Sequence, residues 1–202
     1  MHRDKQRDSG NKLIIREPFT IAIHLLLGGI VVLFLGLTYG YLFQMGEHWL
    51  AFRMPKVFWL STVTILCVSV FLQQLVKSYD KDNSKLVRRN LLLAFAFACV
   101  FIGCQVQGWL FLIDNNIRLG TSPSTSYMYL LTGLHGIHVL VGIIFLTVGI
   151  FRAFVNTSDE VKSLIYFSDP MRRTRLRLLR NYWHTIDFLW VFLFLVFLYK
   201  HT

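Results

Sequence analysis

The chain has 202 residues, of which 54% are hydrophobic and 16% are charged, and it carries a formal net charge of +10. A soluble domain averages about 25% charged residues, so this composition argues against a soluble globular protein. Several apolar runs approach or exceed the roughly 18 residues that indicate a membrane span. The polar stretches between these runs are too short to fold separately, which predicts a single membrane domain over residues 1–202.

Five apolar segments are long enough to cross a membrane as helices. The first follows a polar tail at residues 1–17, which lacks the apolar core and cleavage site of a secretory signal. A helix rises 1.5 Å per residue, so each segment approaches or exceeds a hydrocarbon core of about 30 Å. Helices also satisfy their own backbone groups in lipid. We therefore predict an all-α bundle of five transmembrane helices. They cover residues 19–44, 57–76, 91–113, 126–151 and 182–199.

Lysines and arginines are divided unequally between the two ends of these helices. Seventeen of the 21 lie in the tail and in the loops after the second and fourth segments. Because cytoplasmic loops are rich in Lys and Arg, the N-terminus is predicted to be cytoplasmic and the C-terminus to lie on the outer side. The charge thus marks topology and contact with anionic lipid and argues against nucleic-acid binding. Residues 171–180 carry five arginines and predict a basic interfacial helix. The other side carries Arg53, Lys56, Arg118 and Lys200.

Polar side chains within the fourth segment suggest a helix contact. His135 and His138 are three residues apart and share one helix face, which Gly142 extends, and Gly133 precedes them. Small residues let a neighbouring helix approach closely, and histidines beside them can hydrogen-bond across the contact. We predict a structural role. A metal site is the alternative, since histidine is a common ligand, but two histidines supply only half of a typical site.

The last segment begins with a cluster of charged and aromatic side chains. His184 and Asp187 are three residues apart and can pair, and Arg180 lies one turn before His184. Trp183 stands where an aromatic belt would anchor the helix. We predict a structural polar network near the cytoplasmic edge of the membrane. A proton relay is the alternative, because ionisable groups in membranes often carry protons.

The first three segments carry further packing signals. Gly29, Gly36 and Gly40 form a stripe of small residues that suits close helix packing. His24 is predicted to be a packing or interfacial histidine, and Gln105 is predicted to bond to a neighbouring helix. Hydroxyls of the second segment can bond back to their own backbone. These hydroxyls belong to Ser61, Thr62, Thr64 and Ser69.

Reactive groups are few inside the predicted spans. Asp187 is the one acid within them, and the histidines there are too few to hold haem and copper on several helices. The cysteines, Cys67, Cys99 and Cys104, show no metal spacing. We therefore predict no catalytic, cofactor or metal site in this chain and no enzyme activity of the chain alone. A small stand-alone transporter and a membrane cytochrome are the alternatives from other classes.

Two segments resemble a known family. Tyr129–Leu146 reads Tyr-x-x-Thr-Gly-x-His-Gly-x-His-Val-x-x-Gly-x-x-Phe-Leu, and Tyr182–Phe194 reads Tyr-Trp-His-x-x-Asp-x-x-Trp-x-x-Leu-Phe. Both are similar to the final helices of subunit III of haem–copper respiratory oxidases, and Phe58–Thr62 resembles a weaker pattern of that family. Five helices match its shorter bacterial members. Where the family often has glutamates, this chain has Ile30 and Arg177, which indicates a divergent member.

The resemblance implies a function. Subunit III has no redox centre; it stabilises subunit I, contacts subunit II and other subunits, and binds phospholipid in a cleft. The complex holds haem and copper in the partner subunit and reduces oxygen to water with electrons from cytochrome c or quinol. Most members also translocate protons. The location implied is the bacterial inner membrane. The nearest alternative within the family is an accessory protein of a nitric oxide reductase.

Overall fold

A computed structural model describes the backbone of residues 2–43 and 55–201, and the side chains of residues 20–43 and 55–200. In this part of the chain all regular structure is helical, and five helices are long and apolar enough to cross a membrane. The predicted all-α bundle of five spans is confirmed. The helices are α1 (His2–Phe43), α2 (Val57–Tyr79), α3 (Ser84–Asp114), α4 (Pro123–Asn156), α5 (Glu160–Ser168) and α6 (Pro170–His201).

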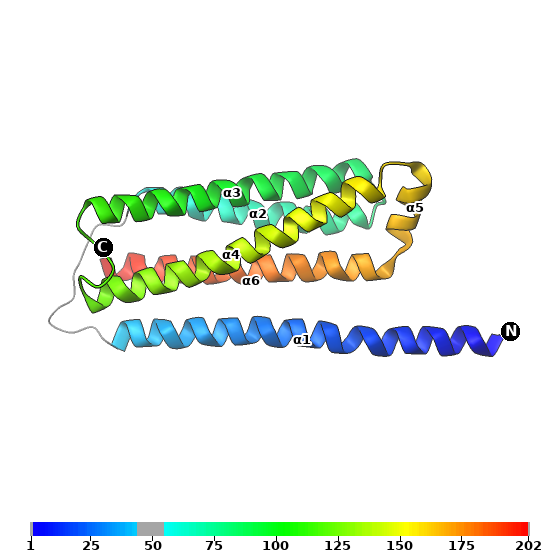
Figure 1. The fold of residues 1–202 in the computed structure, drawn as a ribbon, viewed down its shortest axis with the longest axis horizontal. Helices are drawn as coiled ribbons and strands as arrows, with labels where there is room; N and C mark the ends of the chain where they lie inside the picture. Colours follow the sequence, from blue (N-terminus) through cyan, green and yellow to red (C-terminus); the bar gives the residue numbers. More distant parts are fainter. Residues whose placement is uncertain (1, 44–54, 202) are drawn as a thin grey trace.

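The five long helices lie side by side along one axis (Figure 1). Helix α2 packs extensively against α3, and α4 and α6 complete the main bundle, whereas α1 lies along one side against α4 and α6. The N-terminus, the α2–α3 turn and α5 share one end of the bundle. This end gathers the segments that hold most of the Lys and Arg residues and is called the basic end below. Its position on the cytoplasmic side stays a prediction.

Two helices begin earlier than hydropathy predicted, because polar residues cap them. The side chain of Asn83 accepts a hydrogen bond from the backbone nitrogen of Leu86 at 3.0 Å, and α3 therefore starts at Ser84 rather than at residue 91. Helix α4 starts at Pro123 rather than at residue 126, because Ser122 and Thr125 form a reciprocal capping box. The apolar run thus marks the part of a helix that lies in lipid, and the cap marks where the helix begins.

The two ends of the chain also differ in detail from the prediction. The backbone of α1 is helical from His2, through most of the predicted tail, and its apolar part begins at Thr20. The predicted last residue of this span, Gln44, lies outside the described residues. Residues 171–180 are helical, as predicted, and they form the first turns of α6, which continues directly into its apolar part.

Helix α5 is tied to the end of α2 by the phenol of Tyr79. This hydroxyl donates to the backbone carbonyls of Tyr166 at 2.8 Å and of Asp169 at 3.0 Å. The guanidinium of Arg172 lies 4.6 Å from the ring centre of Tyr166, within the range of a cation–π contact. These contacts set the position from which α6 enters the bundle.

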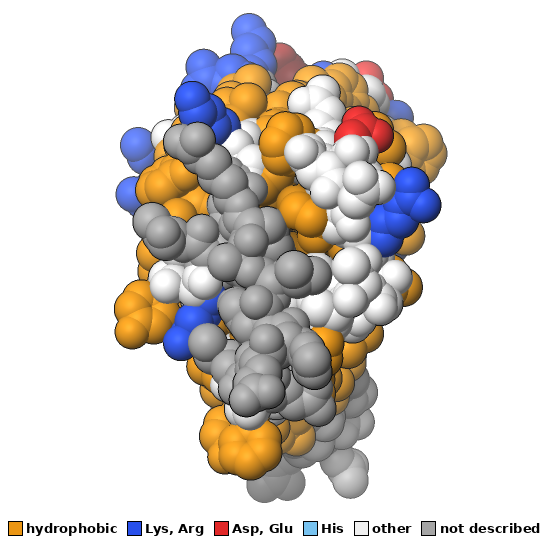
Figure 2. Space-filling view, turned by 90° about the vertical axis from the view of Figure 1, so that its left-hand side faces the viewer, with side chains coloured by type: hydrophobic (Ala, Val, Ile, Leu, Met, Phe, Trp, Pro, Cys, Tyr) orange, Lys and Arg blue, Asp and Glu red, His pale blue; other side chains and the backbone are white. Residues whose placement is uncertain are grey.

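The surface of the bundle is apolar over most of the length of the spans. Exposed large hydrophobic residues occur on every long helix, including Leu25 and Val32 on α1, Val63 on α2 and Phe145 on α4. Figure 2 views one end of the bundle and shows hydrophobic side chains around much of its described flank. Such a surface suits a hydrocarbon solvent, in which apolar side chains face outward at no cost.

Candidate functional site

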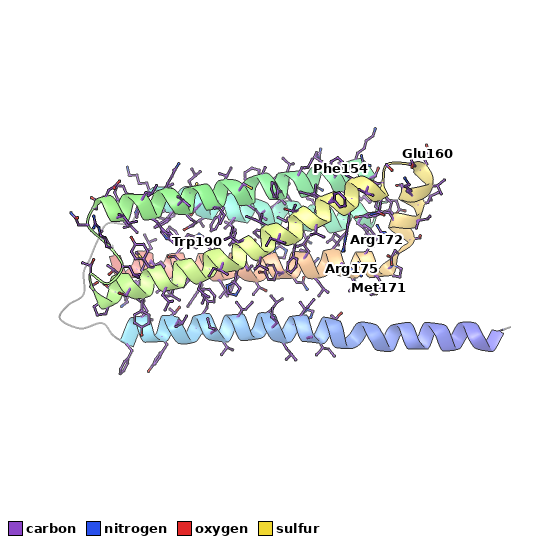
Figure 3. All side chains as sticks on the ribbon, viewed as in Figure 1. Phe154, Glu160, Met171, Arg172, Arg175 and Trp190 are labelled. Atoms are coloured by element: carbon purple, nitrogen blue, oxygen red, sulfur yellow. The ribbon has the colours of Figure 1, made fainter. Side chains whose placement is uncertain are left out.

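His135 lies inside a cage of aromatic rings contributed by α1, α3 and α6. Its side chain is 1% exposed, and its ring centre lies 5.3 Å from that of Trp190, 5.9 Å from Phe101 and 6.4 Å from Phe34. Neither ring nitrogen has a hydrogen-bond partner among the described residues. The hydrogen bond predicted to run from this ring across the helices is therefore not made, and the imidazole packs as an aromatic group instead. Figure 3 shows Trp190 within the bundle.

His138 joins α4 to α6 through its backbone. Its Nδ1 lies 2.7 Å from the carbonyl oxygen of Leu134 in the same helix, so the ring makes no bond to another helix there. The backbone carbonyl of His138 instead accepts a hydrogen bond from the phenol of Tyr182 at 2.8 Å. A hydrogen bond between α4 and α6 thus exists at this position, but it joins a tyrosine hydroxyl to a backbone carbonyl, and the imidazole that was predicted to make it takes no part.

Gly142 of α4 lets the rings of Trp183 and Tyr182 on α6 pack close against the α4 backbone. A Cβ atom placed there would lie 2.8 Å from an atom of the Trp183 indole, closer than real Cβ contacts come. Trp183 is fully buried. A Cβ at Gly133 would lie 3.7 Å from Trp109, an ordinary contact. The tight packing predicted for these glycines is therefore concentrated at Gly142, and the contact of Gly142, Trp183, Tyr182 and His138 is called the α4–α6 seam below.

Ser69 of α2 brings His184 and Asp187 together. Its Oγ lies 2.7 Å from Nδ1 of His184, and its hydroxyl donates to Oδ2 of Asp187. Asp187 is 3% exposed, and its Oδ1 has no hydrogen-bond partner among the described residues. The predicted pairing of His184 with Asp187 is thus made through a third residue, which the sequence had assigned to its own backbone. We call Ser69, His184 and Asp187 the polar trio.

Arg180 makes no direct bond to the polar trio, although it was predicted to belong to the same polar network. Its guanidinium donates to Gln73 Oε1 at 3.4 Å and to Asn181 Oδ1 at 3.0 Å. Among the described residues no hydrogen bond or ion pair joins Arg180 to His184 or Asp187. A guanidinium is more easily solvated at the edge of the membrane than within it, which accounts for this outward position.

A groove of about 380 Å³ separates α1 from α6 near the basic end. His24 and Gly28 of α1 line one side, and Asn181, His184 and Thr185 of α6 line the other. Nδ1 of His24 lies 2.7 Å from the carbonyl oxygen of Thr20, in keeping with a packing or interfacial histidine. The groove therefore reaches the polar trio at His184.

The glycine stripe of α1 makes one close contact inside the chain. A Cβ at Gly40 would lie 3.3 Å from the phenol oxygen of Tyr127 on α4. At Gly29 and Gly36 no atom of another described helix lies within 4 Å of such a Cβ. The close packing predicted at those two positions is not made by this chain, because α1 lies at the side of the bundle and turns these residues outward.

The contact between α2 and α3 contains a glycine whose role the sequence analysis missed. A Cβ at Gly108 would lie 2.3 Å from the Phe58 ring, so only glycine admits that ring. Nearby, Gln105 donates to the hydroxyl of Ser61 at 3.2 Å, as predicted for a glutamine between helices. Ser61 in turn donates to the carbonyl of Phe58 at 2.9 Å. The signal in the sequence that could have predicted this contact was a glycine that stands among bulky residues and next to a glutamine.

The basic end is tied together by charged side chains. Nε and Nη2 of Arg173 donate to the two carboxylate oxygens of Asp80, at 2.7 and 2.8 Å, and this guanidinium holds the pKa of Asp80 below its usual range. Arg88 of α3 donates to the hydroxyl of Thr157 at 2.8 Å and to its carbonyl. Burial raises the pKa of the Tyr166 phenol. These contacts link α2, α3 and the α4–α5 segment to the start of α6.

Metal ligation was weighed for the histidines of α4. Among the described residues, no group of three His, Cys, Asp or Glu side chains is placed to hold a metal ion. The three cysteines are free thiols. The expectation that the chain carries no metal, haem or catalytic group of its own stays a prediction.

These features define a multi-pass helical membrane protein in which several buried polar groups join one helix to another. A family model described as cytochrome c oxidase subunit III matches residues 19–202. The chain therefore belongs to the cytochrome c oxidase subunit III family. The motifs centred on His135 and His184, from which the resemblance was drawn, form the α4–α6 seam and part of the polar trio.

Individual relatives agree with this assignment. The chain is 29% identical over 130 residues to cytochrome c oxidase subunit 3 of Dictyostelium discoideum, covering 64% of this chain and 29% of that protein. It is 43% identical over 116 residues to the subunit of the same name in Rhizopus stolonifer, covering 57% and 37%. Cytochrome bo(3) ubiquinol oxidase subunit 3 of Buchnera aphidicola is 27% identical over 144 residues, covering 71% and 70%. The aligned part thus spans 29% and 37% of the length of the first two of these relatives.

Proposed function

We propose that this chain is the non-catalytic subunit III of a haem–copper terminal oxidase, which reduces oxygen to water. The observation that carries the proposal is the α4–α6 seam. Within a member of the subunit III family, Gly142, Trp183, Tyr182 and His138 lock two helices together. A locked seam is what a scaffold subunit needs, because it presents a rigid face to its partner.

The state of the histidines supports a role without redox chemistry. His135 is enclosed by the rings of Phe34, Phe101 and Trp190, and the Nδ1 of His138 is engaged with the carbonyl of Leu134. The ring of His135 is thereby closed to a haem, whose iron is often held by a histidine. Haem and copper accordingly belong to subunit I, which is the main partner, with subunit II and other subunits as further contacts.

Phospholipid is the proposed ligand of the groove between α1 and α6. Leu27 and Val31 give it an apolar wall, while Asn181 offers an amide and the exposed Arg175 and Arg177 lie within about two turns of it. An acyl chain and an anionic headgroup match these two surfaces. The excess of Lys and Arg at the basic end supports a cytoplasmic position for it in a bacterial inner membrane.

A mild-detergent purification of the tagged chain tests the proposed function. We expect it to recover a large, histidine-rich subunit, identified by mass spectrometry, and an optical spectrum with haem bands in proportion to that subunit. A purification that yields the chain alone and without haem contradicts the proposal and favours a stand-alone transporter. A nitric oxide reductase as the recovered partner contradicts the oxygen-reducing assignment alone.

A further inference from the structure

The polar trio forms a continuous chain of hydrogen-bonding groups from the groove to the core of the bundle. His184 lines the groove, Ser69 Oγ lies 2.7 Å from Nδ1 of His184, and the same oxygen contacts Oδ2 of Asp187. Asp187 lies at the inner end and is almost fully buried. A hydroxyl has one proton to donate and can accept as well, so Ser69 can pass a hydrogen bond in either direction.

Two arrangements of protons satisfy the hydrogen-bonding groups of the polar trio. In the first, Asp187 is ionised, the Ser69 hydroxyl donates to it, and Nδ1–H of His184 donates to Ser69. In the second, Asp187 is protonated and donates to Ser69, whose hydroxyl donates to the bare Nδ1 of a His184 that carries its proton on Nε2. The second arrangement holds one proton more, provided that His184 is neutral in both. The extra proton enters or leaves through Nε2, the ring nitrogen that Ser69 does not occupy.

Burial favours the second arrangement. An ionised carboxylate in an apolar interior is costly unless several donors or a cation compensate it. Among the described residues, Ser69 is the sole hydrogen-bond donor to Asp187, and Oδ1 has no partner. Arg180 is engaged with Gln73 and Asn181 instead.

The titratable groups on the neighbouring helices do not change the preference for a protonated Asp187. Helix α2 contributes the neutral Ser69 and Gln73 to this region, and α1 contributes His24, on the far wall of the groove. Helix α4 contributes His135, which is enclosed by aromatic rings, and His138, which is bonded to its own helix. None of these histidines is hydrogen-bonded to Asp187 among the described contacts.

We propose that Ser69, His184 and Asp187 form a proton-binding site, in which Asp187 is a neutral carboxylic acid at neutral pH and exchanges its proton with the groove through Ser69 and His184. This goes beyond the role of a scaffold subunit. The site binds one proton and releases one, with no oxidant or reductant involved.

Infrared difference spectroscopy on the purified complex tests the site. Subtracting the spectrum of Asp187→Asn from that of the wild type is expected to leave the carbonyl stretching band of a protonated carboxylic acid, which shifts in D₂O. Asp80→Asn is the matched control, because Asp80 is an ion-paired surface carboxylate, and it is expected to leave no such band. Absence of the band from the Asp187 difference spectrum overturns the proposal.

Ser69→Ala keeps the proposal testable if the Asp187 variant does not assemble. This change removes one hydroxyl and adds no bulk. The carboxylic acid band is expected to persist at a shifted frequency, and its exchange in D₂O is expected to slow severalfold. Thr147→Ala removes an exposed hydroxyl of α4 that bonds to Ile143. It is expected to change neither the frequency of the carboxylic acid band nor the rate of its exchange in D₂O. A Ser69→Ala spectrum identical to wild type in this region overturns the proposal.

Discussion

The α4–α6 seam and the outer face of α1 carry similar sequence signals with different structural results. In the seam, Gly142 admits the indole of Trp183, and no side chain could replace it without displacing that ring. On α1, Gly29 and Gly36 face open space, and only Gly40 touches a neighbour closely. A glycine stripe therefore indicates a capacity for close approach, and the position of the helix in the bundle decides whether the chain itself uses it.

The contrast extends to the polar residues beside the glycines. In the seam a hydroxyl reaches a backbone carbonyl of the opposite helix, from Tyr182 to His138. On α1 the Nδ1 of His24 lies close to a carbonyl of its own helix, that of Thr20. Contacts between helices of this kind hold a membrane bundle together where the hydrophobic effect does not. We infer that the seam contributes more to stability than the attachment of α1 does.

Replacing Gly142 by leucine is expected to have the largest effect. The new side chain would overlap the buried Trp183, and overpacking of this kind costs about 1–3 kcal/mol or more. We expect a lower thermal unfolding temperature of the complex and loss of this chain from it, measured by subunit stoichiometry. Gly36→Leu is the matched control within the chain and is expected to unfold like the wild type. Equal loss of stability in the two variants would remove the distinction between the regions.

Replacing Asp187 by leucine is expected to have the next largest effect. The change removes the carboxyl group that bonds to Ser69, and a buried polar group left unsatisfied costs about 1–3 kcal/mol. We expect lower stability with the oxygen-reducing chemistry retained in the complex that still assembles. Intact assembly with abolished oxygen consumption would show a direct role of Asp187 in the reaction.

Tyr182→Phe isolates the hydrogen bond within the seam. It removes the hydroxyl that donates to the carbonyl of His138 and keeps the ring, so a cost of about 1 kcal/mol is expected. Tyr39→Phe is the control, because Tyr39 is exposed on α1. If the melting temperature of Tyr182→Phe were unchanged, the seam would stabilise the protein through the Gly142 contact and not through this hydrogen bond.

Asp80→Asn tests the basic end, where the smallest effect is expected. The ion pair with Arg173 is more than one third exposed, and because solvent screens such surface pairs, their contribution to stability is small. Because Arg173 lowers the pKa of Asp80 in the folded state, this contribution is present above the unfolded pKa of about 3.9 and is lost as the pH falls through the lower folded value. Stability measured against pH is expected to show wild type and variant converging only below about pH 4. Convergence already near pH 6 would contradict this assignment.

Apolar length was sufficient to predict the five spans, because a hydrocarbon solvent demands long runs with few charges. It could not place their ends, since Asn83 and Ser122 extend α3 and α4 by capping geometry outside the apolar runs. The glycine at position 142 was identified from its spacing. The bond between Ser69 and His184 was not, because it depends on how α2 is rotated against α6 and joins residues 115 positions apart.

The central claim is that this chain supports an oxidase without carrying a redox centre. It is tested most directly by dissociating the purified complex into subunits under mild conditions and recording the optical spectrum of each. The account predicts that all haem bands follow the large partner subunit and that this chain is colourless. Haem bands that remain with this chain, in proportion to its amount, would contradict the claim and identify it as a membrane cytochrome.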